Sequence, residues 1–300
     1  PQPPAQTVKI NFPTAGASGA LYAVGAAITN MWSNNVPGVQ AASQASAGGI
    51  ANLNMVSDGE AQVSIAISSN VYQCLNGTDS FKDHPYKDLK AIAGLYMNPN
   101  QVVVTAKSGI QTLADVKGKR FAVASAGSSV YNESNAHFTA AGLKFPDDIQ
   151  AEYITFTDAA DMLQNGSIDG AWIMSGAPAS AVTQALTGGA RLVDIDNQFV
   201  KELKAKYPWY ASYTIKAGTY PNQDRDVRTT AVKMVMFTRG DMPEDVVYNL
   251  TKALWEHIDE LGQAQKNLKG LKPEDAVKDI AGVPLHPGAE RYYREIGVLK

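Results

Sequence analysis

Short loops of small and hydroxyl-bearing residues recur in the sequence, each directly after an apolar, strand-like run. The first loop, Thr14-Ala15-Gly16-Ala17-Ser18-Gly19, follows the strand-like residues 8–12 and precedes a helical pattern that begins near Leu21. Backbone N–H groups at the start of a helix have no partner within the helix, and small side chains let a ligand reach them. These residue types therefore favour the binding of an anionic group by backbone amides and hydroxyls.

The same arrangement returns further along the chain. Residues 46–49 follow a strand-like run at 39–43, residues 68–70 follow 63–67, and residues 125–129 follow 121–124. Strands and helices that alternate at these lengths predict a parallel α/β sheet. In such sheets ligands bind beyond the carboxyl ends of the strands, where all of these loops would lie.

Basic residues are sparse around these loops. Between Lys9 and Lys82 the chain has no lysine or arginine, and between Arg120 and Arg191 it has only Lys144. Each helix start carries roughly half a unit of positive charge together with oriented N–H donors. Several converging helix starts could hold one carboxylate without an arginine. A single isolated loop, in contrast, would be a tight strand–helix turn that binds nothing.

Residues typical of catalysis or metal binding form no recognisable pattern. The four histidines, His84, His137, His257 and His286, lie far apart without metal-ligand spacing, which is typical of surface or structural histidines. Serine-hydrolase signatures and the dinucleotide-binding glycine pattern are missing as well. The single cysteine, Cys74, excludes an internal disulfide and is typical of a buried small hydrophobe. We therefore expect no catalytic residues, no cofactor and no metal.

The composition is that of a globular protein long enough for two cores. The chain has 300 residues, of which 45% are hydrophobic and 18% charged, and its formal net charge is -3. This charge gives no reason to expect nucleic acid or an anionic membrane surface as a partner. No apolar run is long enough to predict a membrane span. The start, Pro1-Gln2-Pro3-Pro4, resembles the stub that remains after removal of a signal peptide.

The regular pattern changes around Ala91. Two strand-like runs, 91–96 and 101–105, are separated by Asn98-Pro99-Asn100, and the loop-to-helix pattern then repeats in a second unit. Residues 207–227 are predicted to form a loop, and the apolar strand 231–237 would carry the chain back. We therefore expect a first lobe built from residues 1–98 and 229–300, a second lobe of residues 99–228, and hinges near 98 and 229.

Several aromatic and polar residues allow two interpretations. Tyr22 and Tyr72 fit either a helix-face core position or a pocket wall. Trp172, at a strand end before Ser175-Gly176, favours a position near the pocket over plain core. Tyr220 fits loop packing or a lid or hinge aromatic. Asn132 fits either a ligand contact or a cap for the helix after Ser129, and its residue type favours the cap. Thr157 is the expected cap of the helix that carries Met162.

Four stretches of the sequence resemble the substrate-binding subunits of TAXI-type TRAP transporters, within a resemblance that runs from Val8 to Lys300. The stretches are 113–120 (Leu-Ala-Asp-Val-Lys-Gly-Lys-Arg), 153–179, 217–221 (Ala-Gly-Thr-Tyr-Pro) and 284–293 (Pro-Leu-His-Pro-Gly-Ala-Glu-Arg-Tyr-Tyr). The resemblance implies an α/β, type II-like, two-lobed periplasmic binding protein, in which two mixed or parallel sheets flanked by helices enclose a ligand cleft. It also implies a small organic acid such as glutamate or 2-oxoglutarate as ligand, TRAP-type membrane permease subunits as partners, a periplasmic location and a monomer.

The resemblance maps the pocket onto the small loops, and the strand ends and aromatics described above add further residues. The candidate ligand-binding residues are Ala15, Gly16, Ala17, Ser18, Gly19, Tyr22, Ser46, Ala47, Gly48, Gly49, Ile50, Ser68, Ser125, Gly127, Ser128, Ser129, Val130, Trp172, Ser175, Gly176 and Tyr220. Ala17, Ile50 and Val130 stand where the family usually carries a hydroxyl, and Ile67 and Ser69 also depart from its pattern. These departures fit a pocket that is more apolar or differently shaped.

The sequence thus predicts an extracytoplasmic solute receptor that closes on a small organic acid, delivers it to a permease and performs no chemistry. The alternative, from another class, is a periplasmic enzyme or a sensor-associated ligand-binding module on the same scaffold. Turnover of a candidate acid would separate the two.

Overall fold

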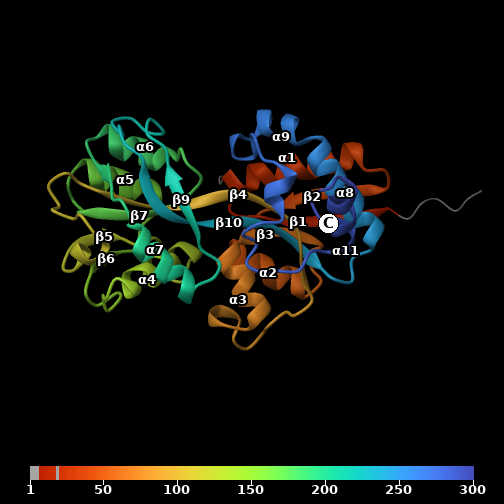
Figure 1. The fold of residues 1–300 in the computed structure, drawn as a ribbon, viewed down its shortest axis with the longest axis horizontal. Helices are drawn as coiled ribbons and strands as arrows, with labels where there is room; N and C mark the ends of the chain where they lie inside the picture. The colour runs from red at the N-terminus through yellow and green to blue at the C-terminus, as the bar shows by residue number, and fades with distance from the viewer. Residues whose placement is uncertain (1–6, 18–19) are drawn as a thin grey trace, which may run out of the picture. The chain divides into compact units, whose positions relative to one another are not determined.

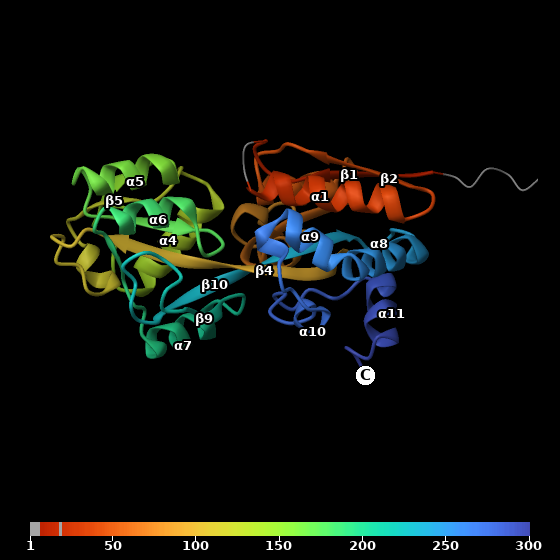
Figure 2. The same ribbon diagram turned by 90° about the horizontal axis from the view of Figure 1, so that it is seen from above.

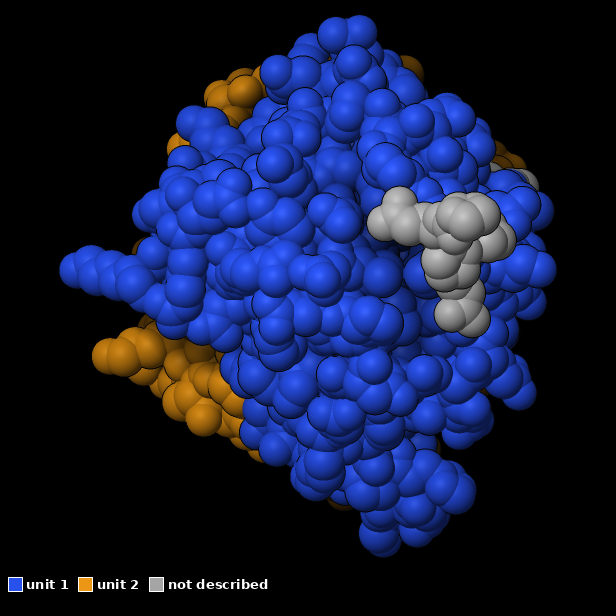
Figure 3. Space-filling view, turned by 90° about the vertical axis from the view of Figure 1, so that its right-hand side faces the viewer, with its two compact units in different colours: residues 1–96, 233–300 blue, residues 97–232 orange. Residues whose placement is uncertain are grey.

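The computed structural model describes residues 7–17 and 20–300 and divides into two compact units. Unit 1 comprises residues 1–96 and 233–300, and unit 2 comprises residues 97–232. Figure 3 colours the units separately and shows unit 1, which is built from both ends of the chain, as one continuous body. The sequence predicts that the chain passes between the two lobes near residues 98 and 229, and in the structure the unit boundaries follow residues 96 and 232. Hinge motion at these boundaries stays a prediction.

Among its described residues, unit 1 contains three complete strands and parts of the two long strands that continue into unit 2 (Figure 1). The strands are β1 (Val8–Pro13), β2 (Val39–Gln44), β3 (Val63–Ile67), the first part of β4 (Leu89–Val104) and the last part of β10 (Val227–Arg239). β1 pairs with β2 in parallel, and β3 pairs with β10 in the antiparallel sense. The helices are α1 (Ala20–Asn35), α2 (Gly49–Ser57), α3 (Ser68–Asn76), α8 (Glu244–Glu256), α9 (Ile258–Ala264), α10 (Pro273–Ala276) and α11 (Pro287–Glu295), with the 3-10 helices η1 (Asp79–Phe81) and η3 (Lys266–Leu268).

The core of unit 1 follows the apolar spacing of its helices. Val24, Ile28 and Trp32, spaced four residues apart on α1, are buried on one face of the helix. Trp32 Nε1 donates to the carbonyl O of Leu250 on α8 at 2.9 Å, so burial of this large side chain leaves no donor unpaired. On α2 and α3, apolar side chains pack against β4 and β10 in a cluster that includes Leu53, Val56, Val71, Cys74, Val235 and Phe237. Each such side chain contributes roughly 1.5–3 kcal/mol of burial free energy.

Unit 2 is a mixed sheet between helices. Its strands are the end of β4, β5 (Arg120–Ala122), β6 (Gln150–Glu152), β7 (Gly170–Met174), β8 (Arg191–Leu192), β9 (Ala211–Ile215) and the start of β10. β5 is parallel to both β6 and β7, β4 is antiparallel to β7 and β8, and β9 is antiparallel to β10. The helices are α4 (Ser129–Ala140), α5 (Phe156–Gln164), α6 (Ser180–Thr187) and α7 (Asn197–Lys206), with the 3-10 helix η2 (Leu113–Val116).

Alternate residues of the central strands of unit 2 face opposite helix layers. Val103, Ala171 and Ile173 pack against α5 and α6, whereas Val102, Val104 and Trp172 pack with side chains of α4 and α7. Figure 2 shows α5 and α6 on the opposite side of β4 from α7. This period of two explains why both faces of β4 and β7 are apolar, and it confirms the expected α/β class.

Two predicted boundaries differ from the structure. The runs 91–96 and 101–105 form one strand, β4, so Asn98-Pro99-Asn100 is not a turn; β4 pairs with β10 and β7, and these neighbours hold it extended despite its turn-forming residues. The predicted loop 207–227 contains β9, which forms because β10 supplies an antiparallel partner. Across the described residues, the longest helices are too short or too polar to cross a membrane.

Candidate functional site

The loops that follow β1 and β2 lie side by side in unit 1. Because these strands are parallel, their carboxyl ends meet at one edge of the sheet. Two backbone bonds extend the pairing into the loops: Thr14 N–H donates to Gln44 O at 3.0 Å, and Ser46 N–H donates to Ala15 O at 3.1 Å. Candidate residues 15–17 therefore lie beside candidate residues 46–48. Ser18 and Gly19 lie outside the described residues.

A buried amide ties these loops to the middle of β3. Asn52 on α2 is 0% exposed, and its Nδ2 donates to Thr14 O at 2.8 Å and to Ile65 O at 3.0 Å. Its Oδ1 accepts from Ser46 Oγ at 2.6 Å, and Ser46 Oγ also accepts from Gly48 N at 3.1 Å. Both N–H groups and the oxygen of Asn52 are thus used to hold three segments together. The hydroxyl proton of Ser46 is committed to this bond.

The start of α2 has no side-chain cap among the described residues. Its N-cap is Gly48, whose φ of 99° is a conformation that L side chains rarely adopt. A serine, threonine or aspartate is therefore disfavoured at this position, and no capping oxygen competes for the first N–H groups of the helix. Gly49 and Ile50, both candidate residues, form the first turn and are half-buried.

Residues 68–70 do not form a loop, so that prediction is wrong. β3 ends at Ile67, α3 begins at Ser68, and all three residues are buried. Their polar groups bond within unit 1: Ser68 Oγ accepts from Lys233 N at 3.1 Å, and Asn70 Nδ2 donates to Gln73 Oε1 at 3.3 Å. Small polar residues are typical of turns because their side chains form hydrogen bonds with nearby polar groups. Here they form such bonds at the buried start of a helix instead.

One lysine reaches this region from a distant part of the sequence. Lys233 on β10 is 4% exposed, and burial lowers the pKa of its ammonium group. Its Nζ donates to the backbone O of Asp275, while the nearby carboxylates of Asp279 and Asp275 favour the charged form. This cation is therefore committed to the segment around α10.

In unit 2, three loops share one edge of the sheet. Because β5 is parallel to β6 and β7, residues 123–128, 153–155 and 175–179 all emerge at the carboxyl ends of these strands. The candidates Ser125 and Gly127 are exposed in the first of these loops. Ser129 and Val130 already belong to the first turn of α4 and are half-buried.

Side chains cap two helix starts of unit 2, at positions that differ from the prediction. Ser128 caps α4 by accepting from Tyr131 N at 3.1 Å, so Asn132 lies inside the helix and is not the cap. Thr155 caps α5 by accepting from Asp158 N at 3.2 Å, so the cap expected at Thr157 is also wrong. A capping hydroxyl serves the N–H group three residues ahead, and both helices start early enough for an upstream hydroxyl to take this role.

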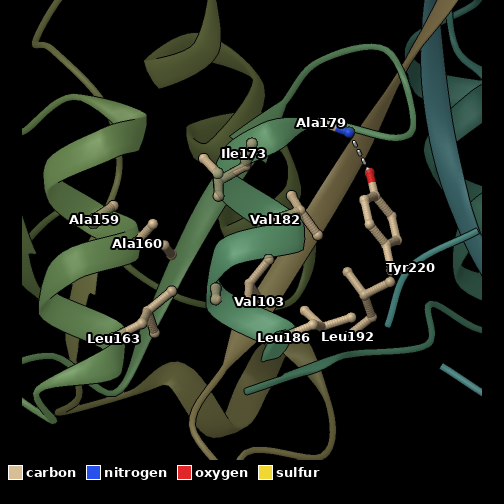
Figure 4. Close-up of a cluster of buried hydrophobic side chains, with 14 of the residues drawn as sticks. Val103, Ala159, Ala160, Leu163, Ile173, Ala179, Val182, Leu186, Leu192 and Tyr220 are labelled. Atoms are coloured by element: carbon tan, nitrogen blue, oxygen red, sulfur yellow. Dashed lines mark hydrogen bonds between the residues drawn. The ribbon is translucent and has the colours of Figure 1, made fainter. Parts of the chain in front are cut away.

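The loop after β7 is held at both ends by buried polar side chains. Gln101 Nε2 on β4 donates to Ser175 O at 2.9 Å. At the other end, Ala179 N donates to the hydroxyl of Tyr220 at 2.9 Å, as Figure 4 shows. The Tyr220 hydroxyl donates to Gln101 Oε1, which closes the arrangement. Tyr220 is 3% exposed and packs in the cluster with Val182 and Leu186, in agreement with the loop-packing interpretation.

Trp172 lies in the core of unit 2 and not on a pocket wall. It is 1% exposed, packs edge-on to Phe138 with ring centroids 5.3 Å apart, and its Nε1 donates to Asn100 Oδ1 at 3.0 Å. Its indole has no accessible surface to offer a ligand because β7 directs it at the layer that contains α4. Tyr22 on α1 and Tyr72 on α3 are half-buried, and their contact with a ligand stays a prediction.

A chain of hydrogen bonds continues from Trp172 through the core of unit 2. Asn100 Nδ2 donates to Thr230 Oγ1 at 3.1 Å, and Thr230 Oγ1 lies 2.7 Å from His137 Nε2. His137 Nδ1 lies 2.7 Å from the backbone O of Glu133, an acceptor, so the Nδ1 carries the proton and the Nε2 accepts. Burial lowers the pKa of His137 to about 4, which leaves the ring neutral. This histidine is structural.

Among the described residues, no cluster of histidine, cysteine, aspartate or glutamate could hold a metal ion. Cys74 is 1% exposed, and burial raises the pKa of its thiol to about 11. At neutral pH this side chain is therefore a small hydrophobe and not a nucleophile.

Solved structures with the same fold cover nearly the whole chain. MatC (Rpa3494) from Rhodopseudomonas palustris with bound malate has a TM-score of 0.57 at 15% identity, over 98% of this chain and 97% of that chain. The periplasmic binding protein BugD has a TM-score of 0.54 at 14% identity, over 98% and 95%. The alkanesulfonate-binding protein SsuA from Xanthomonas axonopodis pv. citri, bound to MOPS, has a TM-score of 0.52 at 17% identity, over 97% and 85%. The fold is that of the two-lobed periplasmic binding proteins.

The sequence itself gives a family. The model of the NMT1-like family matches residues 12–297. This range includes all described helices and, except for the first residues of β1, all described strands. The chain therefore belongs to the NMT1-like family.

Proposed function

We propose that this protein is an extracytoplasmic solute receptor that binds a small organic acid at its small-residue loops and delivers it to a membrane permease. The observation that carries the proposal is the gathering of small-residue loops at the carboxyl ends of parallel strands in each unit. In unit 1 these loops lie beside the uncapped start of α2, where backbone N–H groups suit a carboxylate. The bound malate of MatC, a protein of the same fold, supports an acid as ligand.

The finer assignment rests on the TAXI resemblance. It favours a glutamate-like or 2-oxoglutarate-like acid, TRAP-type permease subunits as partners, a monomer, and a periplasmic location reached through a removed signal peptide. The candidate loop residues that the structure places at the two edges, including Ala15, Gly16, Gly48, Gly49 and Ser125, would contact the acid. Ser46, Ser68, Trp172 and Tyr220 act within their own units through the bonds described above.

Native mass spectrometry of the freshly purified full chain tests the proposal. We expect a population whose excess mass, released by denaturation, identifies a small carboxylic acid. A panel of L-glutamate, 2-oxoglutarate and L-malate should include an acid that raises the melting temperature, because a ligand that binds only the folded state stabilises it. No bound acid and no shift with any acid would contradict the proposal. Conversion of an acid to product at an enzyme-like rate would contradict the receptor function.

A further inference from the structure

The Tyr220 hydroxyl and the Gln101 amide form a buried polar pair in unit 2. Gln101 is 1% exposed and Tyr220 is 3% exposed. Their bonds reach Ser175 O at one end of the loop after β7 and Ala179 N at the other end. The two side chains come from β4 and from a loop more than one hundred residues later, so the pair depends on the complete fold of this unit.

The direction of each hydrogen bond in this pair is fixed. The Ser175 carbonyl only accepts, so Gln101 must present its Nε2 there and its Oε1 to Tyr220. The Ala179 N–H only donates, so the Tyr220 hydroxyl must give its proton to Gln101. Burial raises the pKa of Tyr220 to about 12, which keeps that proton in place at neutral pH. Neither side chain can rotate without leaving a buried group unpaired.

The loop held in this way is one of the candidate ligand loops. It carries Ser175 and Gly176, and Ala179 is the N-cap of α6, a helix without a side-chain cap among the described residues. The hydroxyl of Tyr220 therefore fixes the backbone at the point where the loop enters the helix. The ring of Tyr220 packs separately, against apolar side chains of the same unit (Figure 4).

We infer that Tyr220 and Gln101 are positioning residues, which hold the loop 175–179 in the conformation that contacts the acid while Tyr220 itself does not touch it. This inference rests on the proposed function. A purely structural role would instead limit the effect of these residues to the stability of unit 2. The hydroxyl and not the ring carries the positioning role, so Tyr220→Phe separates the two.

Tyr293 provides a matched control in unit 1. Its hydroxyl accepts from Trp255 Nε1 at 3.0 Å and donates to Ile92 O at 3.0 Å, and its side chain is 0% exposed. Tyr293→Phe therefore removes a buried hydroxyl with the same donor and acceptor pattern. Tyr293 lies on α11, outside every candidate loop.

Hydrogen–deuterium exchange of the ligand-free full chain gives the first readout. In Tyr220→Phe we expect the amides of Gly176, Ala177 and Ala179 to exchange about tenfold faster, the equivalent of one lost buried hydrogen bond. Tyr293→Phe should leave exchange of this segment unchanged. Unchanged exchange in Tyr220→Phe would overturn the inference, because the hydroxyl would then not hold the loop.

Affinity for L-glutamate, 2-oxoglutarate and L-malate gives the second readout, measured by titration calorimetry. An acid that binds the natural chain should bind Tyr220→Phe about tenfold more weakly and Tyr293→Phe within about twofold of the natural value. Equal losses in both variants, or no loss in either, would overturn the positioning role. If no acid binds the natural chain, the proposed function fails, while the exchange experiment still decides whether the pair holds the loop.

Discussion

The two units present similar loops but hold them differently. In unit 1 a single side chain, Asn52, ties the loops after β1 and β2 to β3, and the N-cap of α2 is a glycine with no oxygen to offer. In unit 2 the starts of α4 and α5 are capped by Ser128 and Thr155, and α5 carries Asp158 in its first turn. The loops of unit 1 are thus held by a side chain of α2. In unit 2, in contrast, side chains already accept hydrogen bonds from the first N–H groups of two helices.

This difference indicates where the negative charge of a ligand should go. A capped helix start has fewer N–H groups available, and an acidic residue in its first turn disfavours a second negative charge nearby. The start of α2 in unit 1 has neither feature. We therefore expect the carboxylate to bind at the loops of unit 1.

Removal of Asn52 should have the largest effect. Asn52→Ala leaves the carbonyls of the buried residues Thr14 and Ile65, and the hydroxyl of the half-buried Ser46, without this partner. Each unpaired buried group costs about 1–3 kcal/mol, so we expect unfolding to become easier by about 3 kcal/mol in urea titrations. Binding of 2-oxoglutarate should weaken as well, because the loops lose their common support.

Gln62 offers a control for this prediction within the same unit. Its Oε1 accepts from Asn11 N at 2.9 Å, so it also connects β1 to the segment before β3, but it precedes β3 and lies away from the carboxyl ends of the strands. Gln62→Ala should destabilise unit 1 without altering affinity. If the two variants changed affinity equally for equal losses of stability, Asn52 would be an ordinary core residue.

The sequence predicted the elements whose pattern is local. β1, α1 and β3 have apolar spacing within a single segment, and in the structure each begins within one residue of its expected start. The full extent of β4 and the strand β9 were not predicted, because their conformation depends on partners distant in sequence. Asn98-Pro99-Asn100 favours a turn in isolation, and residues 211–215 become a strand only beside β10. Tertiary pairing overrides local preference at both places.

A change of pH should distinguish the hydrogen bonds around Asn52 from those in the core of unit 2. Asn52 does not titrate, whereas the core of unit 2 contains His137, whose pKa burial lowers to about 4 from 6.5. The unfolded chain therefore binds a proton below pH 6.5 that the folded chain does not bind until about pH 4, so stability falls as the pH falls through this window. At pH 4.5 we expect a loss of about 2 kcal/mol relative to pH 7.5 from this residue.

Urea titrations at both pH values measure this loss. His137→Gln should remove that part of the pH dependence, although it also lowers stability at pH 7.5. His84→Gln, at an exposed histidine, serves as the control substitution. His286 is also buried with a lowered pKa, so some dependence should remain in His137→Gln. An unchanged difference between the two pH values in His137→Gln would contradict the prediction.

The loops of the candidate site were predictable from the sequence, but the side chains that hold these loops in place were not. Runs such as Ser46-Ala47-Gly48-Gly49 are visible in a sequence because their composition is unusual. Asn52 and Gln101 are single amides within apolar segments, and only their partners Thr14, Ile65, Ser175 and Tyr220, all distant in sequence, reveal what they do. The one local signal was a polar residue on the buried face of a helix, as at Asn52 beside Leu53 and Val56, since such a residue needs partners.

A charge placed in the first turn of α2 tests the comparison directly. Ile50→Asp puts a carboxylate at the second position of this helix, where it would repel a bound acid, and Ile50→Asn makes nearly the same loss of apolar packing without the charge. We expect 2-oxoglutarate to bind Ile50→Asp about tenfold more weakly than Ile50→Asn, in titration calorimetry at low salt. Thr157→Asp, at the second position of α5 in unit 2, should have little effect. A greater loss in Thr157→Asp would place the carboxylate in unit 2.

The smallest expected effect concerns the exposed lysines of unit 2. Lys107 and Lys144 are exposed basic side chains of unit 2. Lys107 follows β4, which is antiparallel to β7, and Lys144 precedes β6, so both lie away from the carboxyl ends of β5, β6 and β7. If backbone N–H groups hold the acid, Lys107→Ala and Lys144→Ala should change affinity for 2-oxoglutarate by less than about twofold, and added salt should matter little. A tenfold loss in either variant, about 1.4 kcal/mol, would mean that a side-chain cation of unit 2 binds the anion. The carboxylate would then be assigned to unit 2, where, among the described residues, the starts of α4 and α5 are capped by side chains and the start of α6 is not.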